Sequence, residues 1–153
     1  MDSDGKLSAQ WKGETDRYLP QADLLHFCAQ EGIHITAHQP LGGKPVALVN
    51  PNADHLGPLT DPDIGSLAQA YQKSPAQVLL SWAVQRGTSV VPKTVHEQRM
   101  IENRDLFRLT DEDMGRINDI AGKKGAVRFM DPRNHIGFDI FDEESDQPTE
   151  EGD

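Results

Sequence analysis

The chain has 153 residues, the usual length of one domain, but only 36% of them are hydrophobic, which leaves a thin core for that length. The formal charge is −10, yet residues 139–153 contain eight acids and no base, so residues 1–138 carry 17 acids against 15 bases. A nearly neutral body argues against nucleic-acid binding, and no stretch forms a signal peptide or reaches the ~20 apolar residues of a membrane span.

The two ends of the chain differ from its middle. Residues 1–17 are polar and predict an irregular leader, and residues 139–153 predict a disordered acidic tail, with a dedicated interaction tail as the alternative. The single cysteine, Cys28, excludes an internal disulfide and a cysteine-based metal site. Its apolar neighbours predict a buried, inert thiol, and the scattered histidines predict no metal site. We therefore expect a cytoplasmic protein.

The first regular elements are a helix and a strand. Residues 21–31 have apolar residues at helical spacing, and Gly32 follows at the position where left-handed helix ends favour glycine. Residues 33–37 are rich in β-branched side chains and predict a short strand. Residues 42–58 then form a loop that is longer than compact domains use without a functional reason.

Capping residues predict the starts of three later helices. The caps are Asp61 before Pro62, the Ser-x-x-Gln capping box Ser74–Gln77, and Thr110. The second of these helices is expected to end at Gly87 and the third before Gly122.

The order of elements predicts a parallel α/β protein. Residues 88–91 form a second apolar strand, and residues 95–103 form the following helix, for which Thr94 and Glu97 supply another capping box. Only two strands are evident, so both outer edges of the sheet are expected to be unpaired and to favour self-association. The helices would then bury only part of their inner faces, which carry Leu67, Tyr71, Leu79, Trp82 and Ile117.

The passage from the second strand into its helix is the candidate site. Strand ends in parallel α/β proteins deliver the chain to helix starts, whose free amides and positive dipole end favour an anion. Lys93 places a cation beside this helix start, and Arg99 and Asn103 are four residues apart on one helix face. The residues therefore indicate a site for a phosphate and a flat base, and a capped surface helix with solvated charges remains equally open.

Several motifs, taken together, resemble the C-terminal half of an aldo-keto reductase over about residues 18–122. They are Tyr18-Leu19-Pro20-Gln21, Gly32-Ile33 through Thr36-Ala37, Pro40-Leu41-Gly42, Ser74 through Leu80, and Val91-Pro92-Lys93-Thr94 followed by Arg99, Glu102 and Asn103. The resemblance implies a (β/α)8 barrel of which this chain holds the C-terminal strands and helices, with residues 18–138 as the partial barrel domain.

The resemblance also implies NADP(H) as cofactor and a small carbonyl compound as substrate. Lys93 and Thr94 would contact the 2′-phosphate of the adenosine ribose, and Arg99 would stack on the adenine. The remaining cofactor residues would be Glu102 and Asn103 at the adenine and Leu41 along the cofactor. His38 and Gln39 stand where the family usually has tyrosine and serine, so stacking on the nicotinamide would be weaker.

The family's catalytic aspartate, tyrosine, lysine and histidine have no counterpart among these residues. Tyr18 and Tyr71 are the only tyrosines, and neither matches the proton donor. We therefore expect the chain alone to be inactive, as a C-terminal fragment of a reductase. The alternatives are a non-catalytic remnant that binds a nucleotide or another polypeptide, and a small α/β protein with a new role.

Overall fold

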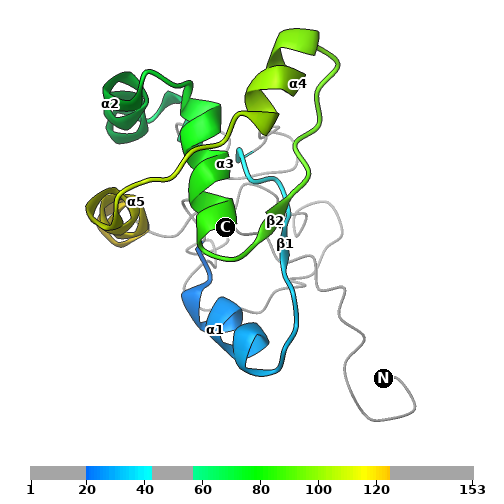
Figure 1. Ribbon diagram of the computed structural model, residues 1–153. Helices are drawn as coiled ribbons and strands as arrows, with labels where there is room; N and C mark the ends of the chain where they lie inside the picture. The colour runs from blue at the N-terminus through cyan, green and yellow to red at the C-terminus, as the bar shows by residue number, and fades with distance from the viewer. Residues whose placement is uncertain (1–19, 43–56, 125–153) are drawn as a thin grey trace, which may run out of the picture.

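The computed structural model describes residues 20–42 and 57–124. The predictions for the leader, for nearly all of the loop over residues 42–58 and for the acidic tail therefore lie outside the described residues. The described elements are α1 (Ala22–Gln30), β1 (Thr36–Ala37), the 3-10 helix η1 (Pro58–Thr60), α2 (Pro62–Tyr71), α3 (Pro75–Gln85), β2 (Ser89–Val90), α4 (Glu97–Arg104) and α5 (Asp111–Lys124) (Figure 1).

The two strands are parallel, as the order of elements predicts. Thr36 lies opposite Ser89 and Ala37 opposite Val90, and the hydroxyl oxygens of Thr36 and Ser89 are 2.7 Å apart. Within the described residues the sheet has these two strands. The chain thus has an α/β fold with a small parallel sheet.

Both strands begin later than predicted, and the reason lies in the helices before them. Gly32 and Gly87 have left-handed backbones, with φ of 67° and 96°. The next residue in each case donates its amide back to the helix, from Ile33 to the Cys28 carbonyl (2.7 Å) and from Thr88 to the Ala83 carbonyl (3.2 Å). These Schellman-type bonds close α1 and α3, so the first residue of each predicted strand, Ile33 or Thr88, belongs to a helix end.

Most of the predicted helix starts are confirmed. The Asp61 carboxylate accepts from the Asp63 amide (2.8 Å), and Thr110 Oγ1 accepts from the Asp113 amide (3.2 Å). Ser74 and Gln77 form the complete capping box. The last helix, α5, continues past Gly122 to Lys124, since one glycine inside a helix costs only about 1 kcal/mol.

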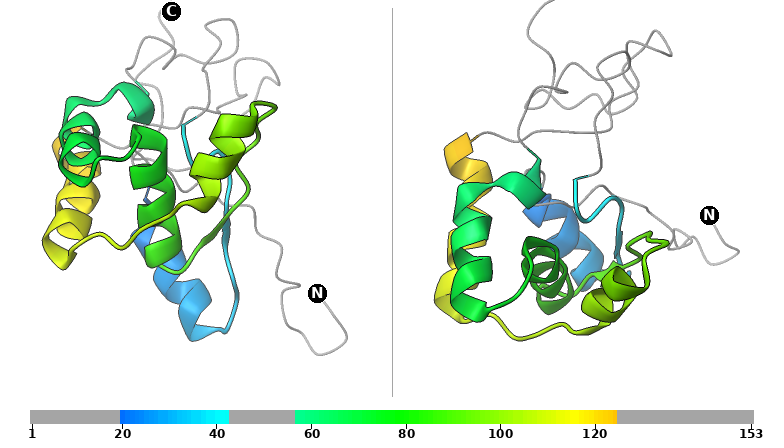
Figure 2. Two further views of the ribbon diagram at one scale, coloured as in Figure 1. Left: turned by 45° about the horizontal axis from the view of Figure 1, so that its top comes forward. Right: turned by 90° about the horizontal axis from the view of Figure 1, so that it is seen from above.

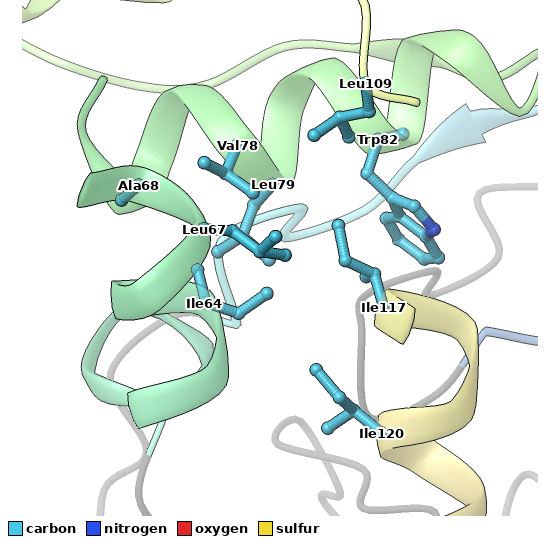
Figure 3. Close-up of a cluster of buried hydrophobic side chains, with 10 residues drawn as sticks. Ile64, Leu67, Ala68, Val78, Leu79, Trp82, Leu109, Ile117 and Ile120 are labelled. Carbon is cyan, nitrogen blue, oxygen red and sulfur yellow. The ribbon is translucent and has the colours of Figure 1, made fainter. Parts of the chain in front are cut away.

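The buried core lies between α2, α3 and α5 (Figure 3). Helix α3 is the central element, with α2 and α5 on one side and the strands on the other (Figures 1 and 2). The expectation that the inner helix faces would be only partly covered is wrong for Leu67, Leu79, Trp82 and Ile117, which are at most 2% exposed. These side chains are buried because the three helices pack on one another, while α3 also packs on β2.

A second contact joins the C-terminal end of α3 to the segment just before α1. The Arg86 guanidinium lies over the Trp82 ring, 4.4 Å from its centre, and donates to the Pro20 carbonyl (2.5 Å), just before α1. Burial lowers the pKa of Arg86. Cys28 on α1 is 3% exposed, which confirms the predicted buried thiol.

Candidate functional site

A cavity of about 470 Å³ lies where the two parallel strands end. Its walls are residues 36–41, which leave β1, and residues 91–93, which leave β2. Because both strands run in the same direction, their carboxyl ends deliver these two segments to the same edge of the sheet. The topology therefore builds a site from parts of the chain that are more than 50 residues apart.

The first wall is a tight turn held against the core. Gln39 has a left-handed backbone, with φ of 49°, and its carbonyl accepts from the Gly42 amide (2.8 Å). Pro40 is buried, and Leu41 packs against the core cluster of α2, α3 and α5. The Leu41 side chain is therefore held in place from behind, which suits it to support a bound ligand.

The second wall brings a positive charge to the cavity. Lys93 follows Pro92 and is exposed, and among the described residues it forms no ion pair. Its ammonium group is thus free to meet an anion without first breaking a contact to a described carboxylate. Leu41 and Lys93, two of the predicted cofactor residues, are brought together at this cavity.

The predicted capping box at the start of α4 is wrong. The helix starts at Glu97, its N-cap is His96 with an extended backbone, and no side chain caps it. Thr94 Oγ1 instead accepts from the His96 amide (3.1 Å), a local turn that keeps the chain extended for two more residues. The amides of Glu97, Gln98 and Arg99 therefore point from an uncapped helix start, which is the usual setting for a phosphate.

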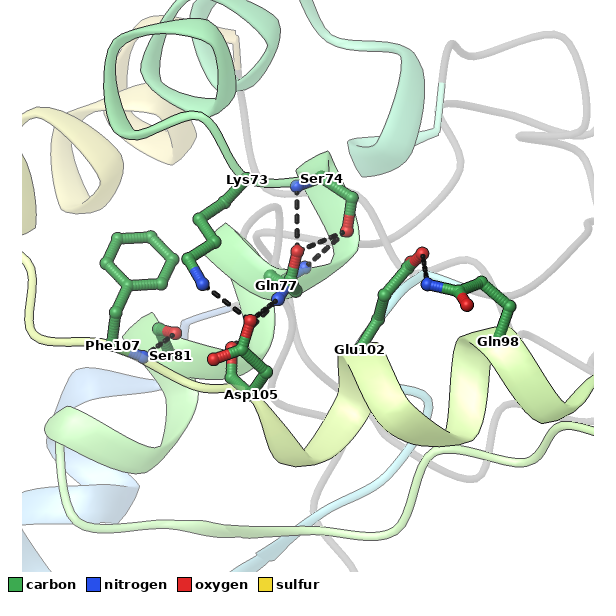
Figure 4. Close-up of polar contacts among 8 residues, drawn as sticks. All are labelled: Lys73, Ser74, Gln77, Ser81, Gln98, Glu102, Asp105 and Phe107. Atoms are coloured by element: carbon green, nitrogen blue, oxygen red, sulfur yellow. Dashed lines mark hydrogen bonds and ion pairs between the residues drawn. The ribbon is translucent and has the colours of Figure 1, made fainter.

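The remaining predicted residues lie on α4 itself. Arg99 is exposed, Glu102 and Asn103 are partly exposed, and positions 99, 102 and 103 lie along one side of the helix. Glu102 Oε1 accepts from Gln98 Nε2 (3.2 Å; Figure 4). These three residues do not line the cavity that holds Leu41 and Lys93. The site thus has two parts, the cavity at the strand ends and the exposed side of α4, joined by the segment that contains Thr94.

His38 and Gln39 also line the cavity, although the sequence indicated them only as departures from a family pattern. Their position directly after β1 is the signal that could have assigned them to the site. A side chain that follows a parallel strand lies at the edge where such proteins bind ligands.

Residues 20–42 and 57–124 contain neither a metal site nor a membrane span. No group of three or more His, Cys, Asp or Glu side chains in this part of the chain is placed to hold a metal ion. None of its helices has the length and apolar character needed to span a membrane.

Comparison with known proteins gives consistent matches. Residues 9–121 match the model of the aldo/keto reductase family. The chain is 39% identical over 133 residues to an NADP-dependent D-sorbitol-6-phosphate dehydrogenase of Malus domestica, covering 84% of this chain and 40% of that protein. It is 37% identical over 123 residues to a glycerol 2-dehydrogenase (NADP(+)) of Saccharomyces cerevisiae, covering 80% of this chain and 36% of that protein.

The fold is matched as well. The crystal structure of Gox0644 in its apo form superposes with a TM-score of 0.58 and 30% sequence identity, over 70% of this chain and 36% of that one. The chain thus spans about two fifths of the length of the curated relatives it matches. Since the family model covers well over half of its residues, the chain belongs to the aldo/keto reductase family.

Proposed function

We propose that this chain forms the NADP(H)-binding part of an aldo-keto reductase. The observation that carries the proposal is the meeting of Leu41 and Lys93 at the carboxyl ends of two parallel strands, with an uncapped helix start a few residues further along the chain. An apolar wall, a cation with no ion pair among the described residues, and helix-start amides that no side chain caps suit an extended ligand that carries both flat rings and phosphates. The names of two relatives, which include NADP, support the same cofactor.

Each predicted residue has a part in this proposal. Lys93, Thr94 and the first amides of α4 hold the 2′-phosphate of the adenosine ribose. Arg99 stacks on the adenine and neutralises phosphate charge, while Glu102 and Asn103 bond the adenine edge. Leu41 supports the cofactor along the cavity. The residues present fit the group because Lys93 and Arg99 form no ion pair with any residue in the described ranges.

The reaction itself is proposed for the complete protein. NADP(H) supplies hydride transfer when it is bound, so the overall activity is the interconversion of a small carbonyl compound and its alcohol. No residue of this chain is assigned to the proton donor. We therefore propose that the 153-residue polypeptide binds the cofactor and does not catalyse aldehyde reduction by itself.

The fold proposal is that residues 18–138 belong to a (β/α)8 barrel. The parallel strand pair and its covering helices support this architecture. Val91, directly after β2, is 76% exposed, and the strand edges that no described residue pairs offer a surface for self-association. A cytoplasmic location is proposed with it, and the free thiol of Cys28 is compatible with a reducing compartment.

Calorimetry with NADP+ and NAD+ tests the cofactor assignment. The wild-type chain is expected to bind NADP+ more tightly than NAD+, and Arg99→Ala is expected to weaken NADP+ binding about tenfold or more, because a stacked cation that also neutralises phosphate charge is lost. Arg104→Ala is the matched control. It removes the same charge from the same helix, but five residues on and therefore roughly 140° around the axis.

Equal affinity for the two nucleotides would remove the 2′-phosphate assignment. An equal loss in the Arg99 and Arg104 variants would reduce the role of Arg99 to general charge. NADPH-dependent aldehyde reduction that copurifies with the chain and disappears in Arg99→Ala would contradict the proposed lack of activity.

A further inference from the structure

Three polar side chains on α3 bond successive points of the segment that joins α4 to α5. Gln77, Ser81 and Gln85 are spaced four residues apart along the helix. Gln77 Nε2 donates to the Asp105 carbonyl (2.8 Å), and Ser81 Oγ accepts from the Phe107 amide (3.1 Å). Gln85 both donates to the Leu109 carbonyl and accepts from the Leu109 amide, each at 3.0 Å. We call these three side chains and their main-chain partners the polar ladder.

The polar ladder can form because the spacing of residues along α3 matches the spacing along the extended segment 105–109. Four residues of α-helix rise about 6 Å, and two residues of extended chain advance about 6.6 Å. Alternate residues of the segment 105–109 therefore meet successive turns of α3. The extended segment 105–109 is therefore held along α3 by side-chain bonds and not by pairing with a strand. This contact fixes the position at which α4 ends and α5 begins.

Helix α4 is held in place mainly at its C-terminal end, where the polar ladder begins with the contact between Gln77 and Asp105. None of its eight residues is buried, so apolar packing does little to hold it. Its C-cap is Asp105, whose amide donates to the carbonyls of Ile101 and Glu102 (3.1 Å each). Gln77 Nε2 also approaches Asp105 Oδ2 (3.1 Å), and Lys73 Nζ lies 2.5 Å from the same oxygen (Figure 4).

Gln77 performs two tasks with its two side-chain atoms. Its Oε1 accepts from the Ser74 amide (3.0 Å) and so completes the capping box that starts α3. Its Nε2 carries the bonds to Asp105. Gln77 is only 4% exposed, so its side chain forms these bonds while buried.

We infer that Gln77 is a positioning residue for nucleotide binding, which acts by fixing the C-terminal end of α4 and thereby the placement of Arg99, Glu102 and Asn103. The inference rests on the proposed function for the role of these three residues. Lys73 supports the same contact through an ion pair with the Asp105 side chain, which is 58% exposed, and solvent screening weakens such a pair. Glutamate would serve the capping box equally well, but it cannot donate to the Asp105 carbonyl and would face the Asp105 carboxylate.

The substitution Gln77→Glu therefore separates the two tasks, and Gln85→Glu is its matched control. The control makes the same change in another residue of the polar ladder. Gln85 lies about 12 Å along α3 from Gln77, at the end of the ladder that is next to α5. Hydrogen exchange of the amides of residues 101–105 and calorimetry with 2′,5′-ADP are measured on the full chain. Gln77→Glu is expected to speed that exchange about tenfold and to weaken binding by a similar factor, while Gln85→Glu leaves both within about twofold.

Equal effects of the two variants on binding and on α4 exchange would overturn the inference, as would unchanged values in Gln77→Glu. If wild-type protein does not bind 2′,5′-ADP, the proposed function fails, and the exchange measurement still decides whether Gln77 fixes α4. If Gln77→Glu does not fold, Asp105→Ala removes the side-chain contacts at an exposed position. It keeps the bond from Gln77 to the Asp105 carbonyl, so exchange of α4 is expected to rise by less than about tenfold. A rise of about tenfold or more would overturn the inference, because it would assign the hold on α4 to the ion pair with Lys73.

Discussion

Single polar side chains tie the elements of this protein together across long stretches of sequence. Tyr71 on α2 donates its hydroxyl to Asp113 Oδ2 on α5 (2.7 Å), and the same hydroxyl accepts from the Thr110 amide (3.1 Å). The hydrogen bond from Tyr71, with support from Thr110 and Arg116, lowers the pKa of Asp113. The carboxylate form of Asp113 therefore stabilises the contact between α2 and α5.

The variant Tyr71→Phe tests this contact, because phenylalanine keeps the ring packing on Phe107. At pH 7 the variant is expected to lose about 1.5 to 3 kcal/mol of unfolding free energy, as expected for a hydrogen bond to a charged group. A depressed aspartate pKa contributes stability above its unfolded value of about 3.9, and this stability is lost as the pH falls through the lower folded value. The difference between wild type and variant, measured by urea unfolding, should therefore shrink below about pH 4. A difference that stays constant with pH would contradict this origin.

At the candidate site, the sequence predicted the order of the elements that meet there but not where the helix after β2 begins. Lys93 was indicated by its place between a strand and a helix, whereas Leu41 was indicated through the family resemblance alone; the structure places both at the cavity where the parallel strands end. The start of α4 could not be placed, since Thr94 has two local bonding choices, a helix cap or a turn, and only the chain direction decides between them. The polar ladder was missed, although Gln77, Ser81 and Gln85 stand four residues apart in an otherwise apolar helix, which is a recognisable signal.

Helix ends explain how the elements could be predicted and why the strand lengths could not. Caps act within four residues, so Asp61, Ser74 with Gln77, and Thr110 could be recognised from local sequence. Strand length depends on which main-chain groups remain after the preceding helix has closed. At Gly32 and Gly87 the helix takes the next amide, which shortens both strands.

Paired glycine substitutions test the importance of these helix ends. Gly87→Ala places a side chain at φ of 96°, and since no atom lies within 4 Å of the added carbon, strain in the backbone is the whole cost. A loss of about 1 to 2 kcal/mol in unfolding free energy is expected. Gly65→Ala lies inside α2, where the added carbon also meets nothing within 4 Å, and should stabilise by up to about 1 kcal/mol. Thermal melts that give both variants the same sign would contradict the assignment.

The 153-residue chain is expected to associate with itself through the strand pair. The core of α2, α3 and α5 is well buried, whereas the segment after β2 exposes Val91 (76%) and Val95 (71%). Apolar side chains beside unpaired strand edges favour contact with a second chain.

Size-exclusion chromatography of Val91→Lys measures this association. The wild-type chain is expected to elute above its monomer mass of 17.0 kDa, and the variant closer to it. Val84→Lys, at an exposed position on α3 (44%), is the control and should behave as wild type. A compact wild-type monomer with one sharp thermal transition would show that the strand edges do not recruit a partner.

The proposed cofactor site is tested most directly by mapping amide chemical shifts during titration with 2′,5′-ADP. If the 2′-phosphate binds at the end of β2, the largest shifts fall on Lys93, Thr94 and the uncapped amides of Glu97, Gln98 and Arg99. Adenosine 5′-monophosphate, which lacks the 2′-phosphate, should shift these amides much less at the same concentration. Shifts confined to other segments, or equal shifts with the two nucleotides, would contradict the assignment of this site to NADP(H).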